Sequence, residues 1–147
     1  MSAYEAITNH QLVLAVFGQW PSFHDGEIHR LILDRTRRLP DGAFYPSVEL
    51  FLRGWIMTSE VTEADYYKLQ NDSIVHFLFE QVTDLELDGL NHQNVLSSLK
   101  LELVQDQESG SPVLAVALSH CYGLSGGFKA VRASVVSVAP YVSETAA

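Results

Sequence analysis

The sequence predicts an α+β fold, in which a mainly antiparallel β-sheet of about six strands carries one N-terminal helix packed on it. Apolar residues alternate with polar ones over short segments, and turn residues separate these segments. Parallel strands would need crossovers of about a dozen residues or more, usually helical, and few such segments exist in this chain. The most economical arrangement is an antiparallel meander in a single domain spanning residues 1–147.

The N-terminal segment predicts the helix, which we expect to begin near Ala3 and to end at Gly18. Asn9 can cap a short helix, because its side-chain oxygen can accept a hydrogen bond from an unpaired backbone N–H. The apolar residues expected on one face of the helix are Leu12, Val13, Val16 and Phe17.

Six segments are predicted as strands, at residues 27–36, 45–58, 73–82, 98–106, 113–120 and 128–140. The second alternates well, with Val48, Leu50, Leu52 and Ile56 inward if Gly54 does not form a bulge. The fourth places Leu99, Leu101 and Leu103 inward, with Lys100 and Glu102 outward. Residues 59–73 form a polar stretch that predicts a connector with one helical turn at most.

The charge and the cysteine content indicate the kind of partner and compartment. The formal net charge is -9, from 18 acidic and 9 basic side chains. Such a surface repels nucleic acid and anionic membranes, and it attracts a basic protein. Cys121 is the single cysteine, so no internal disulfide can form, and no apolar run reaches membrane-spanning length. Together with the absence of a basic segment before an apolar one at the N-terminus, these features predict a cytoplasmic protein.

The stretch FGQWPSFHDGE, residues 17–27, raises the question of a metal site. His24, Asp25, Glu27 and His29 could supply ligands. However, zinc signatures with this spacing normally lie on a helix, and Gly26 and the β-like run after it disfavour one. The interpretation we favour is structural, with no metal and no cofactor.

In the structural interpretation, this stretch joins the helix to the sheet. Trp20 and Phe23 are apolar anchors on either side of Pro21, whose ring fixes its own φ. Ser22 and Asp25 can accept hydrogen bonds from nearby backbone N–H groups, and Asp25-Gly26 is a typical turn pair.

Two further motifs suggest catalysis, and neither has the context that it needs. Ser125 lies in GLSGG, which formally matches G-x-S-x-G, but the following residues predict a strand where a nucleophile elbow requires a helix. Cys121 is adjacent to His120, and neighbouring strand residues point to opposite faces. A small metal-dependent or serine hydrolase therefore remains the alternative to a binding protein, and a housekeeping interaction module is a third possibility.

The segment DGLNHQNVLSSL contains a second polar group, Asn91 to Asn94. Asparagine can cap a helix or adopt a left-handed backbone, so a hydrogen-bonded bend is the favoured interpretation of this segment and a binding site is the alternative.

Taken together, these motifs resemble the immunity protein 50 family over most of residues 12–140. The matching positions are Trp20, Pro21, Ser22, Phe23, His24, Asp25 and Glu27 in a first element, Asn91, His92, Gln93, Asn94 and Val95 in a second, and Tyr122 and Gly123 near the end. Gly26 departs from the family pattern, which usually has another small residue, often alanine, at that position.

The resemblance implies a bacterial protein of a polymorphic toxin system that binds and neutralises a cognate toxin. It supplies no catalytic residues and no cofactor, so the matching residues are structural or binding residues. Many toxins of such systems are basic nucleases, which agrees with an acidic inhibitor that is steered toward a basic partner.

Overall fold

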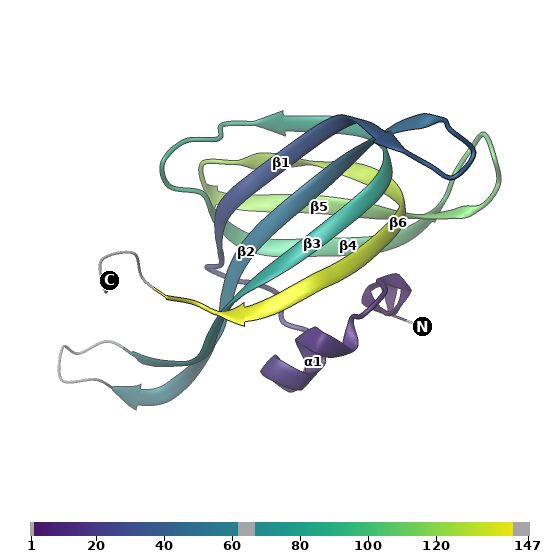
Figure 1. The fold of residues 1–147 in the computed structure, drawn as a ribbon. Coiled ribbons are helices and arrows are strands. Elements are labelled where there is room, and N and C mark those ends of the chain that lie inside the picture. The colour runs from purple at the N-terminus through teal and green to yellow at the C-terminus, as the bar shows by residue number, and fades with distance from the viewer. Residues whose placement is uncertain (1, 62–66, 143–147) are drawn as a thin grey trace.

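The computed structural model describes residues 2–61 and 67–142 and contains a closed barrel of six antiparallel strands (Figure 1). The strands are β1 (Glu27–Arg38), β2 (Phe44–Val61), β3 (Tyr67–Asp88), β4 (Val95–Gln105), β5 (Pro112–Tyr122) and β6 (Ser125–Pro140). Around the barrel their order is β1-β2-β3-β6-β5-β4. The predicted antiparallel sheet of six strands is confirmed.

The barrel consists of two three-stranded meanders, β1–β2–β3 and β4–β5–β6. Pairing of β3 with β6 joins the meanders, and pairing of β1 with β4 closes the barrel. A single meander in chain order is therefore wrong, because β3 neighbours β6 and not β4. The β2–β3 hairpin is also longer than expected: β2 continues to Val61 and β3 begins at Tyr67, so these parts of the predicted connector are strands. Its central residues, 62–66, lie outside the described residues.

The core lies inside the barrel, where the predicted alternation places apolar side chains. Val48, Leu50 and Leu52 on β2 are fully buried, as are Val75, Phe77 and Phe79 on β3. On β4, Leu99 is buried and Lys100 and Glu102 are exposed, as predicted, while Leu101 and Leu103 are partly buried against the core. The pairing of β2 with β3 shifts register between Gly54 and Ile56, so an irregularity does occur at this point, and Ile56 is only partly buried.

The N-terminal helix is shorter than predicted and is preceded by a separate 3-10 turn, η1 (Ala3–Ala6). Helix α1 spans Gln11–Phe17, and its N-cap residue is His10. The expected cap at Asn9 is wrong, because Asn9 adopts a left-handed backbone with φ of 65°. The expected end is confirmed, since Gly18 is left-handed and its N–H donates to the Leu14 carbonyl at 2.8 Å.

Helix α1 lies beside the strands with one face against the barrel (Figure 1). Val13 and Phe17 are buried there and Val16 is partly buried, whereas Leu12, expected on the same face, is 44% exposed. The segment before the helix joins the sheet through a bridge between Thr8 and Ser134 of β6. Among the described residues, no helix has the length and apolar character needed to cross a membrane.

Candidate functional site

The barrel closes along one seam, which we define as residues 22–28 paired with residues 94–99. The backbone N–H groups of Ile28 and Asp25 donate to the carbonyls of Asn94 and Leu96, both at 2.9 Å. The N–H of Leu96 donates to the Gly26 carbonyl at the same distance. The first and second motif elements of the sequence therefore lie side by side, although about seventy residues separate them.

Aromatic packing anchors the first element to the core. Phe23 is 3% exposed and meets the rings of Phe17, Trp20 and Phe77 edge-to-face at 6.1 to 6.2 Å between centroids. Trp20 is only partly buried, and it stacks on Tyr4 of the 3-10 turn at 5.0 Å. The predicted anchoring of helix to sheet is therefore the arrangement found, with Phe23 the more deeply buried of the two anchors.

A tight turn follows Phe23 and brings the chain into β1. The Gly26 N–H donates to the Phe23 carbonyl at 2.9 Å, and both Phe23 and Asp25 have left-handed backbones, with φ of 60° and 64°. A Cβ atom on Gly26 would lie 2.9 Å from the carbonyl oxygens of Phe23 and Arg53. Glycine at this position therefore lets the turn lie directly against β2.

The polar side chains of this turn are exposed. The Nδ1 atom of His24 lies 2.9 Å from the Ser97 carbonyl across the seam, and its Nε2 atom lies 3.6 Å from Asp25 Oδ1. The Ser22 hydroxyl accepts a 3.3 Å hydrogen bond from the His24 N–H. With side chains 69% and 45% exposed, the His24–Asp25 pair adds little to stability. Both side chains remain open to a partner.

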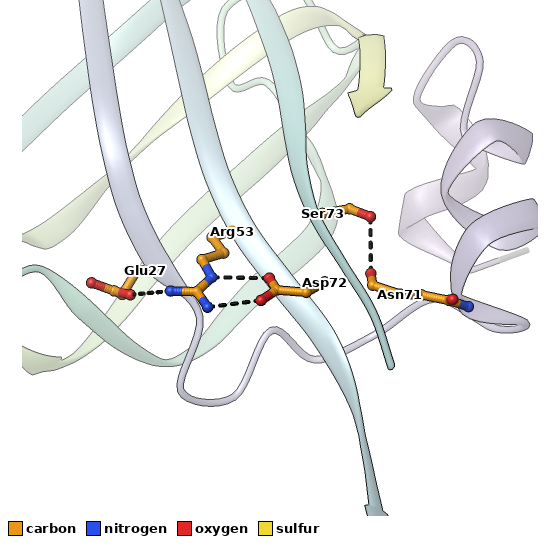
Figure 2. A network of polar contacts seen from close by, with 5 residues as sticks. All are labelled: Glu27, Arg53, Asn71, Asp72 and Ser73. Atoms are coloured by element: carbon orange, nitrogen blue, oxygen red, sulfur yellow. Dashed lines mark hydrogen bonds and ion pairs between the residues drawn. The ribbon is translucent and has the colours of Figure 1, made fainter. Parts of the chain in front are cut away.

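Glu27 belongs to an ion-pair network that sequence reasoning missed (Figure 2). Arg53 donates to both carboxylate oxygens of Asp72, at 2.9 and 2.7 Å, and to Glu27 Oε2 at 3.0 Å. Its guanidinium carbon also lies 3.9 Å from the ring centroid of Tyr141 and 5.2 Å from that of Trp55. The Asp72 hydrogen bonds are the main reason that the pKa of Arg53 is raised above its usual value.

This network ties three strands and the end of β6 together. Glu27 on β1 and Arg53 on β2 are directly opposite in the sheet register. The ion pair between them can therefore be predicted once the register of the β1–β2 hairpin is known. Asp72 lies next to Asn71, whose side chain donates to the Val16 carbonyl of α1 at 2.7 Å. The network therefore connects the seam to the region where the helix packs.

The second element is a bend built around a buried amide. Asn94 is 7% exposed, and its Oδ1 accepts hydrogen bonds from the N–H groups of Asn91 and Leu124, both at 3.0 Å. Its Nδ2 donates to the Asn91 carbonyl at 2.7 Å. Gly123 packs so closely that a Cβ atom on it would lie 2.5 Å from Asn94 Oδ1. Asn94 therefore joins the second element to Gly123 and Leu124, in agreement with the predicted hydrogen-bonded bend.

The remaining motif side chains point into solvent. His92 and Gln93 are exposed, and Tyr122 is 59% exposed although it is a large aromatic residue. Pro21 is partly buried beside Trp20.

A groove of 780 Å³ runs along the outside of the seam, where the two elements meet. Residues from both elements line it together with the end of the chain: Glu27, Ile28, His29, Arg30, Phe51, Ile74, Asn91, His92, Asn94, Tyr141 and Val142. His29 lies at an irregularity in the pairing of β1 with β2, and its ring meets Tyr141 edge-to-face at 5.4 Å. The groove mixes aromatic walls with polar groups.

The catalytic alternatives gain no geometric support from the residues that the structure describes. Ser125 opens strand β6, so the chain runs strand–turn–strand at GLSGG and not strand–turn–helix. A Cβ atom on Gly126 would lie 2.0 Å from the Glu86 carbonyl, so this glycine serves the close approach of β3 and β6. Cys121 is exposed, and no group of three His, Cys, Asp or Glu residues is placed to hold a metal within the described ranges.

The comparison with protein families identifies the chain. The model of the family described as Immunity protein 50 matches residues 9–141. The chain therefore belongs to the Immunity protein 50 family, a description that points to a role in immunity to a toxin. No curated protein and no solved structure matches it.

Proposed function

We propose that this chain binds a cognate bacterial toxin in the cytoplasm and neutralises it by direct contact, without any turnover of its own. The observation that carries the proposal is the family match over residues 9–141, which includes the seam and its groove. A protein that acts by binding needs a rigid scaffold and an accessible surface, and the chain combines a closed barrel with exposed polar and aromatic side chains.

The motif residues divide into two groups in this proposal. Phe23, Asn94 and Gly123 hold the seam together, because they are buried or in close contact with buried atoms. His24, His92 and Tyr122 are exposed and available to the toxin. Tyrosine is enriched among the residues that dominate binding energy at interfaces, so Tyr122 is the first contact residue to test.

The net charge of -9 indicates a basic toxin. Opposite charge accelerates the encounter of two proteins, and salt screens this effect over about 8 Å at physiological ionic strength. We therefore expect the association rate to fall steeply as salt rises, while the dissociation rate changes much less.

The test is co-expression with the toxin domain encoded beside this chain's gene, followed by binding kinetics at two salt concentrations. We expect protected cells and a stable complex. Tyr122→Ala should weaken the complex, and Gln107→Ala, a change at an exposed position in the turn between β4 and β5, serves as the matched control.

Failure to protect cells together with no detectable complex would defeat the proposal. Protection without a complex would instead indicate an enzyme that modifies the toxin or its product, and Ser125 would then be the first residue to replace.

A further inference from the structure

Strand β1 has a free edge along most of its length. It pairs with β4 only at Glu27, opposite Val95, and from Arg30 to Arg38 its strand partner is β2 alone. In Figure 1, β1 accordingly forms the margin of the β1–β2–β3 layer. A strand with one unpaired side presents a row of free N–H and C=O groups, which can pair with an extended segment of another chain.

The part of this edge that is suited to pairing is Arg30–Asp34. These five residues keep a regular register with β2, whereas register shifts occur just before Arg30 and between Asp34 and Arg37. Such bulges limit pairing with arbitrary strands, because they bend the edge and interrupt the ladder. What remains between them is about the length of an ordinary strand.

The edge is basic in an otherwise acidic protein. Residues 30–38 contain four arginines and one aspartate, a net charge of +3, while the whole chain carries -9. Arg37 is paired with Glu80 at 3.0 Å and Arg38 lies over the ring of Phe44. Arg30 lies over the ring of Phe51 at 5.4 Å. Neither Arg30 nor Arg35 forms an ion pair among the described residues, so both guanidinium groups can still bind a carboxylate of a partner.

Apolar surface accompanies this charge. Leu31 and Leu33 lie opposite Leu50 and Val48 of β2, whose side chains point into the barrel, and Leu31 packs against the core. Leu33 is 53% exposed although its partner on β2, Val48, is fully buried. An added strand would cover Leu33 on this face. The opposite face of the segment carries Arg30, Ile32 and Asp34, and Arg35 follows at the bulge.

We propose that the toxin docks on this edge by adding an extended segment beside Arg30–Asp34. A carboxylate side chain of that segment faces Arg30, and a second contacts Arg35 at the bulge. An apolar side chain on the opposite face covers Leu33. This inference rests on the proposed function and names the surface and the kind of segment that it binds. A toxin that is basic elsewhere would approach in one orientation, because its acidic segment alone suits the basic edge.

A second copy of the chain is the competing occupant of this edge. Antiparallel pairing of two β1 edges about Ile32 would set Arg30 of one copy opposite Asp34 of the other. The oligomeric state of the free protein therefore distinguishes the two occupants.

The first experiment reverses one charge on the edge. Arg35→Glu is compared with Lys100→Glu, which makes the same charge change at an exposed position on β4. Because the change removes an attractive contact and adds a repulsive one, we expect Arg35→Glu to raise the Kd for the toxin domain by about tenfold or more. Lys100→Glu should alter it by about twofold or less, since its charge acts only at long range.

The second experiment tests the backbone contacts directly. Adjacent residues of a strand point their N–H groups in opposite directions, so one of Ile32→Pro and Leu33→Pro removes a bond to β2 and the other removes a free edge donor. The variant that keeps the wild-type melting temperature is the edge variant, and we expect it to lose toxin binding. Hydrogen exchange of the wild-type complex provides a second readout, in which alternate amides of Arg30–Asp34 become protected.

The outcomes separate this inference from the proposed function. If the wild-type chain forms no complex, the proposed function fails. If the wild-type complex forms and the edge variants bind as tightly as the Lys100→Glu control, only the docking surface is wrong. A dimer in which β1 amides are protected, or RNA binding that Arg35→Glu abolishes while toxin binding persists, would also overturn it.

Discussion

The seam and the free edge of β1 meet at the start of this strand, yet different residue types build them. At the seam, buried Phe23 and Asn94 and the small Gly26 fix both sides by packing and hydrogen bonds. Along the edge, one side of β1 is unpaired, the residues include four arginines, and the pairing with β2 shifts register twice. The motifs in which the sequence resembles the family lie at the seam or beside it, where Phe23 and Asn94 contribute to barrel closure. A surface that selects one toxin can then reside on neighbouring residues outside the motifs.

The strongest test of this difference is removal of the aromatic anchor at the seam. Phe23→Ala should lower the free energy of unfolding by about 3–5 kcal/mol, because it leaves a cavity between Phe17, Trp20 and Phe77. Phe44→Ala, at a 51% exposed position beside the edge, should cost less than about 0.5 kcal/mol. Urea denaturation measures both, and equal losses would remove the distinction between the two regions.

The next largest effect is expected at Asn94. Asn94→Ala leaves the N–H groups of Asn91 and Leu124 without their acceptor, and each unpaired buried group costs about 1–3 kcal/mol. The neighbouring Gln93→Ala removes an exposed side chain and should change stability by about 0.5 kcal/mol or less. Thermal unfolding of the two variants checks this, and a stable Asn94→Ala protein would show that the bend does not depend on the amide.

An intermediate effect is expected in the ion-pair network at the start of β1. Replacing Arg53 by methionine should cost about 1–3 kcal/mol, because hydrogen bonds to charged groups are lost and Asp72 is left unpaired. Arg53→Lys should recover only part of this loss, since an ammonium group cannot bond both oxygens of Asp72 in the bidentate geometry. A double-mutant cycle with Asp72→Ala isolates the pair, and a coupling near zero would contradict its role.

How far the sequence predicts this molecule depends on whether the determinant is local. The alternation of Val48, Leu50 and Leu52 predicted strand β2 and its buried face correctly, because side chains in a strand repeat with a period of two. The barrel depends on β3 meeting β6 and on β1 meeting β4, and no local pattern records these pairings. Leu12 shows a related limit, since helical periodicity placed it inward whereas the short helix leaves it exposed.

The candidate site shows the same division. Turn chemistry and aromatic anchoring of the first element were predictable, because proline, glycine and buried rings act within a few residues. Arg53 and Asp72 were missed, since their partners come from other strands and only the sheet register brings them together.

The smallest effect is expected at Asp34, the last residue of the segment Arg30–Asp34 that we propose for docking. Asp34 directly precedes the bulge in β1. Its Oδ1 accepts hydrogen bonds from the Thr36 N–H at 2.8 Å and from the Thr36 hydroxyl at 2.9 Å, and these bonds hold the pKa of Asp34 below its usual value of 3.8. A carboxyl group whose pKa is lower in the folded state stabilises that state above its unfolded pKa, and the stabilisation is lost as the pH falls through the folded value. We therefore expect the Thr36 amide to lose its protection from hydrogen exchange only below pH 3.8, with little change in global stability because the pair is exposed.

NMR titration follows the Thr36 amide and the Asp34 carboxyl group together, and Asp34→Asn, which removes the titrating charge, is the control. If the Thr36 amide exchanged rapidly at neutral pH in the wild-type protein, Asp34 would not hold the bulge. The hydrogen bonds of Asp34 would then not explain why the regular part of the edge ends after five residues.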